Sequence, residues 1–345
     1  MNSIRKILYP FSFLFGIIIG IRNKCFDLGI IESKSFDLPV IAVGNLSVGG
    51  TGKSPMIEYL IRIFASDYKT AVVSRGYGRN TKGFLMASEG SKARDIGDEP
   101  YQFFRKFKNL TVVVDEKRVR GIEKLRQMRP ELELILLDDA FQHRYVKAGF
   151  YILLTAYDKL YSDDLMLPAG NLREPGSGAN RADLIVVTKC PPDLNEKKKG
   201  EIISKLSNDS NEPIFFSCID YDEQITNDSG EEIAVSSLDG YKVLLITGIA
   251  NPRPLVNFLK GKKLDIEQLK YSDHQFIGKK EFRSIEKKFN GMSGDRKLIL
   301  TTEKDYVRSF QNVDLPVYYI PIRTRILDQG EKFNELIQDY VRKNQ

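Results

Sequence analysis

The sequence predicts an α/β protein, in which a larger domain with a parallel sheet is followed by a smaller α/β domain. The apolar run Pro39–Val43 leads through a glycine-dense loop into the helical pattern Met56–Phe64. A second unit of strand, loop and helix begins with the apolar run Tyr241–Thr247. Between them, Leu132–Leu137 is almost continuously apolar, as expected of a strand buried on both faces of a parallel sheet. A chain of 345 residues is also long for one core and suits two domains.

Charge and cysteine content limit the partners and the compartment. The formal net charge of +6 favours acidic partners such as phosphates or anionic lipids. Neither zinc-finger spacing nor an aromatic-basic RNA signature occurs, so we expect no nucleic-acid partner, and we expect no obligate protein partner. The three cysteines, Cys25, Cys190 and Cys218, are scattered and form no CxxC pair, which indicates a reducing cytoplasm.

The most apolar segment of the chain is Ile7–Ile21, which cations flank on both sides. Fifteen helical residues span about 22 Å, which is less than the hydrocarbon core of about 30 Å. No small-residue cleavage site follows, so a signal peptide is disfavoured. We expect a monotopic anchor whose apolar side chains lie at the headgroup boundary of an anionic membrane. The alternative is an N-terminal helix that packs against the domain.

A variant phosphate-binding loop (P-loop) is predicted after the first strand. Glycines let successive backbone N–H groups point toward an anion, and the N-terminus of the next helix adds its positive dipole end. Lys53 can reach the outer phosphates, and the Ser54 hydroxyl can bind Mg²⁺. The strict pattern would place a glycine at Ser47, and the alternative is a flexible connection that binds nothing. We assign nucleotide binding to Gly49, Gly50, Thr51, Gly52, Lys53 and Ser54.

Two further segments of the larger domain carry charged groups. A strand at Thr70–Ser74 leads into a cationic loop, and the adjacent carboxylates of Asp98 and Glu99 precede a helix at Tyr101–Lys108. On local grounds these carboxylates could be ordinary caps and first-turn charges. Next come a strand at 111–114 and a helix at 115–128 that contains Arg118.

The apolar strand Leu132–Leu137 ends in Asp138 and Asp139. Its carboxyl end should lie beside the P-loop, where ligands of open α/β sheets bind. Carboxylates at this position are typical of a Walker B site, in which a hard oxygen donor binds Mg²⁺ or its waters. Gln142 and His143 follow at the same edge, and His143 could simply hydrogen-bond the carboxylates.

The remaining segments complete the two domains. Strands at 150–154 and 184–188 flank the Pro- and Gly-rich loop Leu167–Pro175, where Arg173 and Glu174 form either a solvated pair or part of a substrate loop. The loop at Gly248 lacks a Lys-Ser/Thr pair and is no second P-loop. The predicted organisation is a membrane-contacting helix at 1–24, a P-loop domain at 25–238, a smaller α/β domain at 239–315, and a return strand with a C-terminal helix at 316–345.

The chemistry expected of these parts is phosphoryl transfer. A kinase needs a group that orients or deprotonates the acceptor hydroxyl, and Asp98 with His274 could do so across a domain cleft, although no spacing rule links them. Guanine recognition is disfavoured, because Pro191 stands where the aspartate of Asn/Thr-Lys-x-Asp would follow Thr188 and Lys189. ATP is therefore the expected nucleotide.

Six motifs together resemble the tetraacyldisaccharide 4'-kinase family, the lipid A 4'-kinases of Gram-negative bacteria. They occur in the order of that family and extend over most of the chain, including both domains. The motifs are VGNLSVGGTGKSP (43–55), SRGYGR (74–79), GDEP (97–100), LLDDAFQHR (136–144), LPAGNLREP (167–175) and DHQF (273–276).

The resemblance implies an enzyme at the cytoplasmic face of the bacterial inner membrane that transfers the γ-phosphoryl group of ATP, with Mg²⁺, to the 4'-hydroxyl of a tetraacylated glucosamine disaccharide 1-phosphate. It implies two α/β lobes joined by a short β linker. Asp98 would be the base and His274 its partner, while Glu99 and Arg118 would assist at the metal or the phosphates. Ser54, Glu99, Asp138 and Asp139 would form the metal site. The substrate side would contain Gln142, His143, Arg173 and Glu174.

Two other functions are compatible with part of the pattern. A membrane-associated switch ATPase of the deviant Walker A type has a similar loop, but Val48 occupies the place of its signature lysine. A non-enzymatic nucleotide-binding module would use the N-terminal segment to dock a protein. Neither alternative predicts ATP turnover that depends on a lipid disaccharide.

Overall fold

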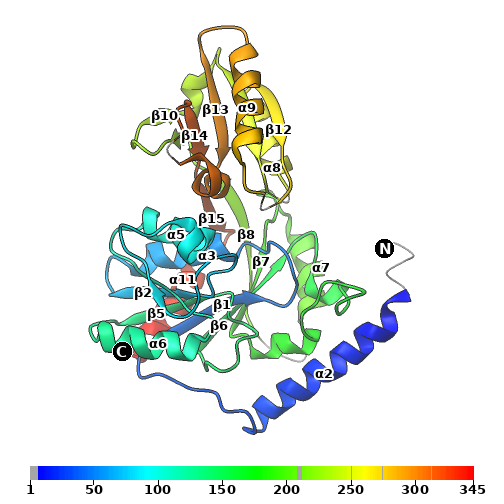
Figure 1. Ribbon diagram of the computed structural model, residues 1–345. Helices are drawn as coiled ribbons and strands as arrows, with labels where there is room; N and C mark the ends of the chain where they lie inside the picture. The colour runs from blue at the N-terminus through cyan, green and yellow to red at the C-terminus, as the bar shows by residue number, and fades with distance from the viewer. Residues whose placement is uncertain (1–6, 208–211, 250, 274, 312) are drawn as a thin grey trace.

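The computed structural model describes residues 7–207, 212–249, 251–273, 275–311 and 313–345. Two sheets form two lobes that lie one above the other (Figure 1). The large lobe contains a nine-stranded sheet, and the small lobe contains a six-stranded sheet. The α/β class predicted from the sequence is confirmed.

The centre of the large sheet is β1 (Val40–Asn45), which lies parallel to β5 (Leu134–Asp138) on one side and to β6 (Phe150–Ala156) on the other. All six residues of β1 are buried, which explains why the sequence shows an apolar run instead of an alternating pattern. The strand order is β15-β8-β7-β6-β1-β5-β2-β4-β3. The other strands are β2 (Thr70–Ser74), β3 (Leu85–Met86), β4 (Thr111–Val114), β7 (Leu184–Thr188), β8 (Ile214–Tyr221) and β15 (Ile322–Ile326).

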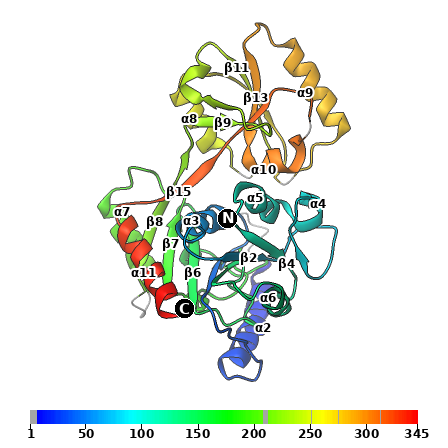
Figure 2. The same ribbon diagram turned by 90° about the vertical axis from the view of Figure 1, so that its left-hand side faces the viewer.

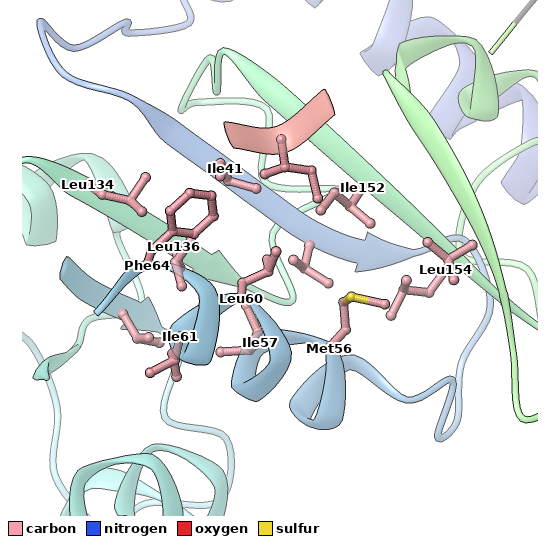
Figure 3. Close-up of a cluster of buried hydrophobic side chains, with 14 of the residues drawn as sticks. Ile41, Met56, Ile57, Leu60, Ile61, Phe64, Leu134, Leu136, Ile152 and Leu154 are labelled. Carbon is pink, nitrogen blue, oxygen red and sulfur yellow. The ribbon is translucent and has the colours of Figure 1, made fainter. Parts of the chain in front are cut away.

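Helices cover both faces of this sheet. On one face, α3 (Lys53–Phe64) and α11 (Gly330–Lys343) pack on the strands with α5 (Asp98–Lys106). Figure 3 shows Met56, Leu60 and Phe64 of α3 against the strands of this face. On the other face lie α6 (Arg118–Met128) and α7 (Glu196–Leu206). Short helical turns at α4 (Ala93–Ile96), η1 (Tyr161–Asp163) and η2 (Gly176–Arg181) complete the lobe.

The apolar N-terminal segment forms a long helix, α2 (Tyr9–Asp27), at the edge of the large lobe (Figure 1). Only Ser12 and Phe26 of this helix are buried. Its polar residues fasten it to the lobe: the Ser12 hydroxyl accepts the Ala169 amide at 2.9 Å, and the Arg22 guanidinium donates to the Gln142 carbonyl at 3.2 Å. Within the described ranges, no helix has both the length and the apolarity that crossing a bilayer requires.

The small lobe has the strand order β10-β9-β14-β13-β11-β12. Its parallel strands are β11 (Lys242–Thr247), β12 (Asp265–Lys270), β13 (Lys297–Thr302) and β14 (Val317–Ile320), and β9 (Gln224–Thr226) and β10 (Glu232–Ala234) add an antiparallel edge. The helical elements are η3 (Val235–Leu238), α8 (Arg253–Gly261), α9 (Lys279–Gly291), α10 (Glu303–Asp305) and the π-helical turn η4 (Tyr306–Phe310).

Two strands connect the lobes. β8 and β15 pair antiparallel at one edge of the large sheet, and a few residues beyond them the chain enters β9 and leaves β14 of the small sheet (Figure 2). The small sheet therefore extends from residue 224 to residue 320. The predicted boundaries differ: the range 239–315 for the smaller domain leaves out β9 and β10, and β14 falls in the predicted range 316–345. The first two have three residues each, and a turn-rich sequence joins them, so they resemble a connector.

Candidate active site

The glycine loop turns between the buried strand β1 and the first turn of α3. Gly49 and Gly52 have φ values of +107° and +84°, which favour glycine. Gly44 must also be glycine, because a Cβ there would lie 2.6 Å from Phe141 Cβ. Lys53 is the first residue of α3, so the residues assigned to nucleotide binding surround a helix N-terminus. The buried Thr51 hydroxyl has no hydrogen-bond partner among the described residues, and it fits a ligand oxygen.

Asp139 lies beside the P-loop and pairs with two cations. Its carboxylate lies 3.7 Å from Lys53 Nζ and 3.0 Å from Arg173 Nη2, and its φ of +47° turns it away from the strand direction. Burial opposes ionisation of this carboxyl, but the charges of Lys53 and Arg173 outweigh it and lower the pKa of Asp139. Arg173, predicted on the substrate side, therefore lies beside the P-loop, next to Asp139 and Asn45.

Asp138 ends β5 and is 1% exposed. One carboxylate oxygen accepts the Ser74 hydroxyl at 3.0 Å, and the other is buried without a partner within the described ranges. Burial, together with the charges of Glu99 and Asp139, raises the pKa of Asp138 to about 7. A buried carboxylate oxygen with no donor fits a cation or its water ligands.

Glu99 lies in the first turn of α5 and meets both the P-loop helix and the small lobe. Its Oε1 accepts the Ser54 hydroxyl at 2.6 Å and also accepts Lys304 Nζ from α10. Burial opposes ionisation, but Lys304, Ser54 and Lys53 together lower the pKa of Glu99 to about 2.

The predicted metal residues Ser54, Glu99, Asp138 and Asp139 thus lie close to one another beside the P-loop. Among the described residues, however, no three Asp, Glu, His or Cys side chains converge closely enough to hold a metal ion alone. This arrangement fits Mg²⁺, which keeps several waters and takes phosphate oxygens as ligands alongside one or two carboxylates.

Asp98, the predicted base, is the first residue of α5. Its Oδ2 accepts Arg308 Nε of the small lobe at 2.7 Å. Its predicted partner, His274, lies outside the described residues, so the pair of Asp98 and His274 stays a prediction. Beyond the carboxyl end of β12, the Gln275 amide donates to the Ser272 carbonyl at 3.1 Å.

Arg118 begins α6 and is 4% exposed. It donates to the Glu116 carbonyl at 3.3 Å, and its Nε has no partner within the described ranges. Burial lowers the pKa of Arg118, and the charges of Asp138 and Asp139 oppose this shift, so the guanidinium lies within their field. This position fits the predicted contact with phosphate.

Gln142 and Glu174 form a framework beneath the P-loop. Gln142 Nε2 donates to the Asn45 carbonyl and to Glu174, both at 2.8 Å. Glu174 is 1% exposed and also accepts Arg181 at 2.8 Å and Asn23 at 3.0 Å. Buried donors thus surround the Glu174 carboxylate, and its predicted place on the substrate side stays a prediction.

His143 lies beside three arginines. Burial and then the charges of Arg118, Arg22 and Arg75 lower the pKa of His143 to about 4. The imidazole is therefore neutral at pH 7, and its Nε2 is buried without a partner among the described residues. The alternative that this nitrogen hydrogen-bonds the carboxylates is not what the structure shows.

Several residues of the site were not found from the sequence. Asn45 accepts Lys53 Nζ at 3.3 Å, Lys189 Nζ contacts the Gly50 carbonyl, and Lys304 and Arg308 come from the small lobe. Lys304 lies in the segment TTEKD (301–305), which matches no motif with a predicted role. Its position at the carboxyl end of β13 is the signal that could have assigned it.

Comparison with known proteins gives consistent matches over the whole chain. The family described as Tetraacyldisaccharide-1-P 4'-kinase (LpxK) matches residues 4–342. A protein of Flavobacterium johnsoniae named Tetraacyldisaccharide 4'-kinase is 49% identical, over 100% of this chain and 99% of its own. A protein of the same name from Bacteroides thetaiotaomicron is 43% identical, over 99% and 94%.

One solved structure has the same architecture. It is the "apo" form of LpxK from Aquifex aeolicus in complex with ATP, with a TM-score of 0.77 and 28% identity. The match covers 98% of this chain and 100% of that one.

Proposed function

The chain belongs to the tetraacyldisaccharide-1-P 4'-kinase family, and on this premise we propose that it transfers the γ-phosphoryl group of ATP to the 4'-hydroxyl of a tetraacylated glucosamine disaccharide 1-phosphate. The observation that carries the proposal is the meeting of Lys53 and Ser54 with Glu99, Asp138 and Asp139 at the carboxyl ends of β1 and β5. A P-loop next to such carboxylates is the arrangement that phosphoryl transfer from a nucleotide requires.

The residues of the site divide into three roles. Lys53, Arg118 and Arg173 bind and orient the triphosphate, because their cations face its charge. Ser54, Glu99 and Asp138 would hold Mg²⁺, which when bound neutralises charge on the phosphate oxygens. Asp98 accepts the proton of the acceptor hydroxyl, as a carboxylate base positioned at the lobe interface.

The acceptor reaches this site from a membrane surface. Most of the apolar side chains of α2 are exposed, including Phe11 at 62% and Phe13 at 69%, and Arg22 and Lys24 add cations near its C-terminal end. A lipid substrate requires an enzyme at the interface, and an exposed apolar helix with flanking cations suits a monotopic contact with an anionic bilayer. These features support our proposal that the enzyme acts at the cytoplasmic face of the inner membrane.

A direct assay tests the function. The purified full chain is incubated with γ-labelled ATP, Mg²⁺ and the lipid disaccharide, and the lipid fraction is examined for label. We expect labelled lipid, formed only when the acceptor is present and lost in Lys53→Ala. Release of labelled phosphate without labelled lipid would favour the switch ATPase instead.

A further inference from the structure

The small lobe places a lysine in the phosphate site of the large lobe. Lys304 Nζ donates to Glu99 Oε1, the same oxygen that accepts the Ser54 hydroxyl. Lys304 and Glu99 are 205 positions apart, so the contact exists only because the two lobes meet. A cation that shares a carboxylate oxygen with the P-loop serine lies where a bound triphosphate would be.

The residues on either side of Lys304 hold its backbone in place. Glu303 accepts Lys106 of α5 at 2.7 Å. Asp305 accepts the Gly248 amide at 2.9 Å and the Thr302 hydroxyl at 2.7 Å, and it pairs with Arg308 at 3.2 Å. A side chain on so well-supported a turn is preorganised for one direction of contact.

The arrangement of the strands explains why Lys304 lies beside the P-loop. The loop of Lys304 follows the carboxyl end of β13, and the P-loop follows the carboxyl end of β1. Ligands of open α/β sheets bind at such ends, and here the ends of both sheets are brought to one interface (Figure 2). The π-helical turn η4, which directly follows α10, belongs to a class of turns found frequently at functional sites.

The charges of this interface suit an anion with several oxygens. Lys53 and Lys304 approach Glu99 from opposite lobes, and Arg173 neutralises Asp139 nearby. A triphosphate offers oxygens that compete with Glu99 for the Lys304 ammonium, and a charge-assisted contact of this kind is stronger than a neutral hydrogen bond.

We propose that Lys304 is a phosphate-binding residue supplied by the small lobe: with ATP bound, its ammonium contacts the outer phosphate oxygens, so that the nucleotide itself joins the two lobes. The proposal rests on the function proposed above. A different role would be to neutralise Glu99 without touching the nucleotide, and the experiment must separate the two.

Equilibrium binding to the full-length chain provides the first readout, with a non-hydrolysable ATP analogue and ADP as probes. Lys304→Ala should weaken binding of the analogue by about 10- to 100-fold, which corresponds to one lost contact to a charged group. The same substitution should weaken binding of ADP much less, since ADP lacks the outermost phosphate. Lys304→Arg should recover part of the affinity, because the cation remains.

Arg105→Ala is the matched control, since it removes another ion pair between the lobes, with Asp228 at 2.8 Å, away from the P-loop. It should leave both affinities unchanged. Circular dichroism and thermal unfolding establish that each variant is folded. The labelled-lipid assay on the wild-type chain runs in parallel, so failure of the proposed function would be recognised separately.

A double-mutant cycle then decides between contact and neutralisation. In the Glu99→Gln background, Lys304→Ala should still weaken binding of the analogue by a similar factor, because the lysine contacts the phosphate directly. If the second substitution causes no further loss in this background, Lys304 acts only through Glu99 and the proposal is overturned. If Lys304→Ala lowers the affinities for ADP and the analogue equally, or lowers neither, the proposal is overturned as well.

Discussion

Neighbouring carboxylates of the phosphate site differ in protonation because their surroundings differ. Glu99 has a lysine, a serine hydroxyl and a second lysine around it, and its pKa falls to about 2. Asp138 is similarly buried, but burial and the charges of Glu99 and Asp139 outweigh Lys53 and the Ser74 hydroxyl, and its pKa rises to about 7. Local partners, more than burial alone, decide which of these groups is ionised without ligands.

We expect Asp98→Asn to lower kcat for phosphoryl transfer by about 10²- to 10⁴-fold, the usual contribution of a general base. The amide keeps the size of the side chain and cannot accept the proton of the hydroxyl. Glu89→Gln, an exposed carboxylate before α4, is the control and should leave kcat unchanged. An Asp98→Asn enzyme with wild-type kcat would remove Asp98 as the base.

The histidine next to the arginines should resist protonation. The chain has two histidines, so NMR titration of ring resonances, with His143→Gln for assignment, can follow His143 alone. We expect its pKa near 4. The folded-state pKa is lowered, so stability from the neutral ring is present above pH 6.5 and is lost as the pH falls toward 4. A His143 resonance that titrates near pH 6.5 would contradict this environment.

The sequence identified the residues that lie on contiguous motifs and missed those that depend on distant contacts. Lys53, Ser54, Asp138 and Asp139 follow apolar strands, so their proximity could be predicted from parallel-sheet topology. Lys304 and Arg308 reach the site only through the packing of the lobes. A motif also does not show how many buried donors surround a carboxylate such as that of Glu174.

Among the elements, buried parallel strands were predictable and exposed edge strands were not. β1 and β5 are buried throughout and show as apolar runs. β12, with the sequence DIEQLK, is largely exposed at the edge of the small sheet. Its charged residues interrupt the apolar pattern by which a strand is predicted from sequence. The predicted helix at 115–128 begins instead at Arg118, because the Asp115 carboxylate accepts the Lys117 amide at 2.9 Å in a turn.

Helix α2 gives a prediction at this scale. Phe11→Asp combined with Phe13→Asp should strongly reduce co-sedimentation with anionic vesicles, because charge replaces exposed apolar area at the interface. ATP binding should be unaffected, since these side chains point away from the lobe. Met128→Asp with Ile203→Asp, exposed apolar residues of α6 and α7, is the control and should bind vesicles normally. Unchanged sedimentation of the Phe11 and Phe13 variant would refute the anchor.

At the scale of the whole molecule, ion pairs between α5 and the small lobe hold the lobes together. Lys106 forms ion pairs with two buried carboxylates, Glu58 at 2.8 Å and Glu303 at 2.7 Å. One ammonium cannot fully compensate both, so burial and the Glu58 charge outweigh Lys106 and raise the pKa of Glu303 to about 7. The contact between the lobes therefore depends on pH.

The folded-state pKa of Glu303 lies above its ordinary value of 4.5, so the folded chain binds more protons between pH 4.5 and 7. Glu303 should thus lower the free energy of unfolding as the pH rises through this range. Urea unfolding from pH 4.5 to 8 should show a weaker decrease in Glu303→Gln than in the wild type. Identical pH profiles for the two proteins would contradict the raised pKa.

The central claim is that two lobes bring a nucleotide triphosphate against one sugar hydroxyl, and the position of the transferred phosphate tests it most directly. The product made from ATP and the lipid disaccharide can be examined by ³¹P–¹H correlation NMR. We predict one new phosphomonoester, coupled to the proton at carbon 4' of the disaccharide. A phosphate at another hydroxyl, or phosphate released only to water, would contradict the account.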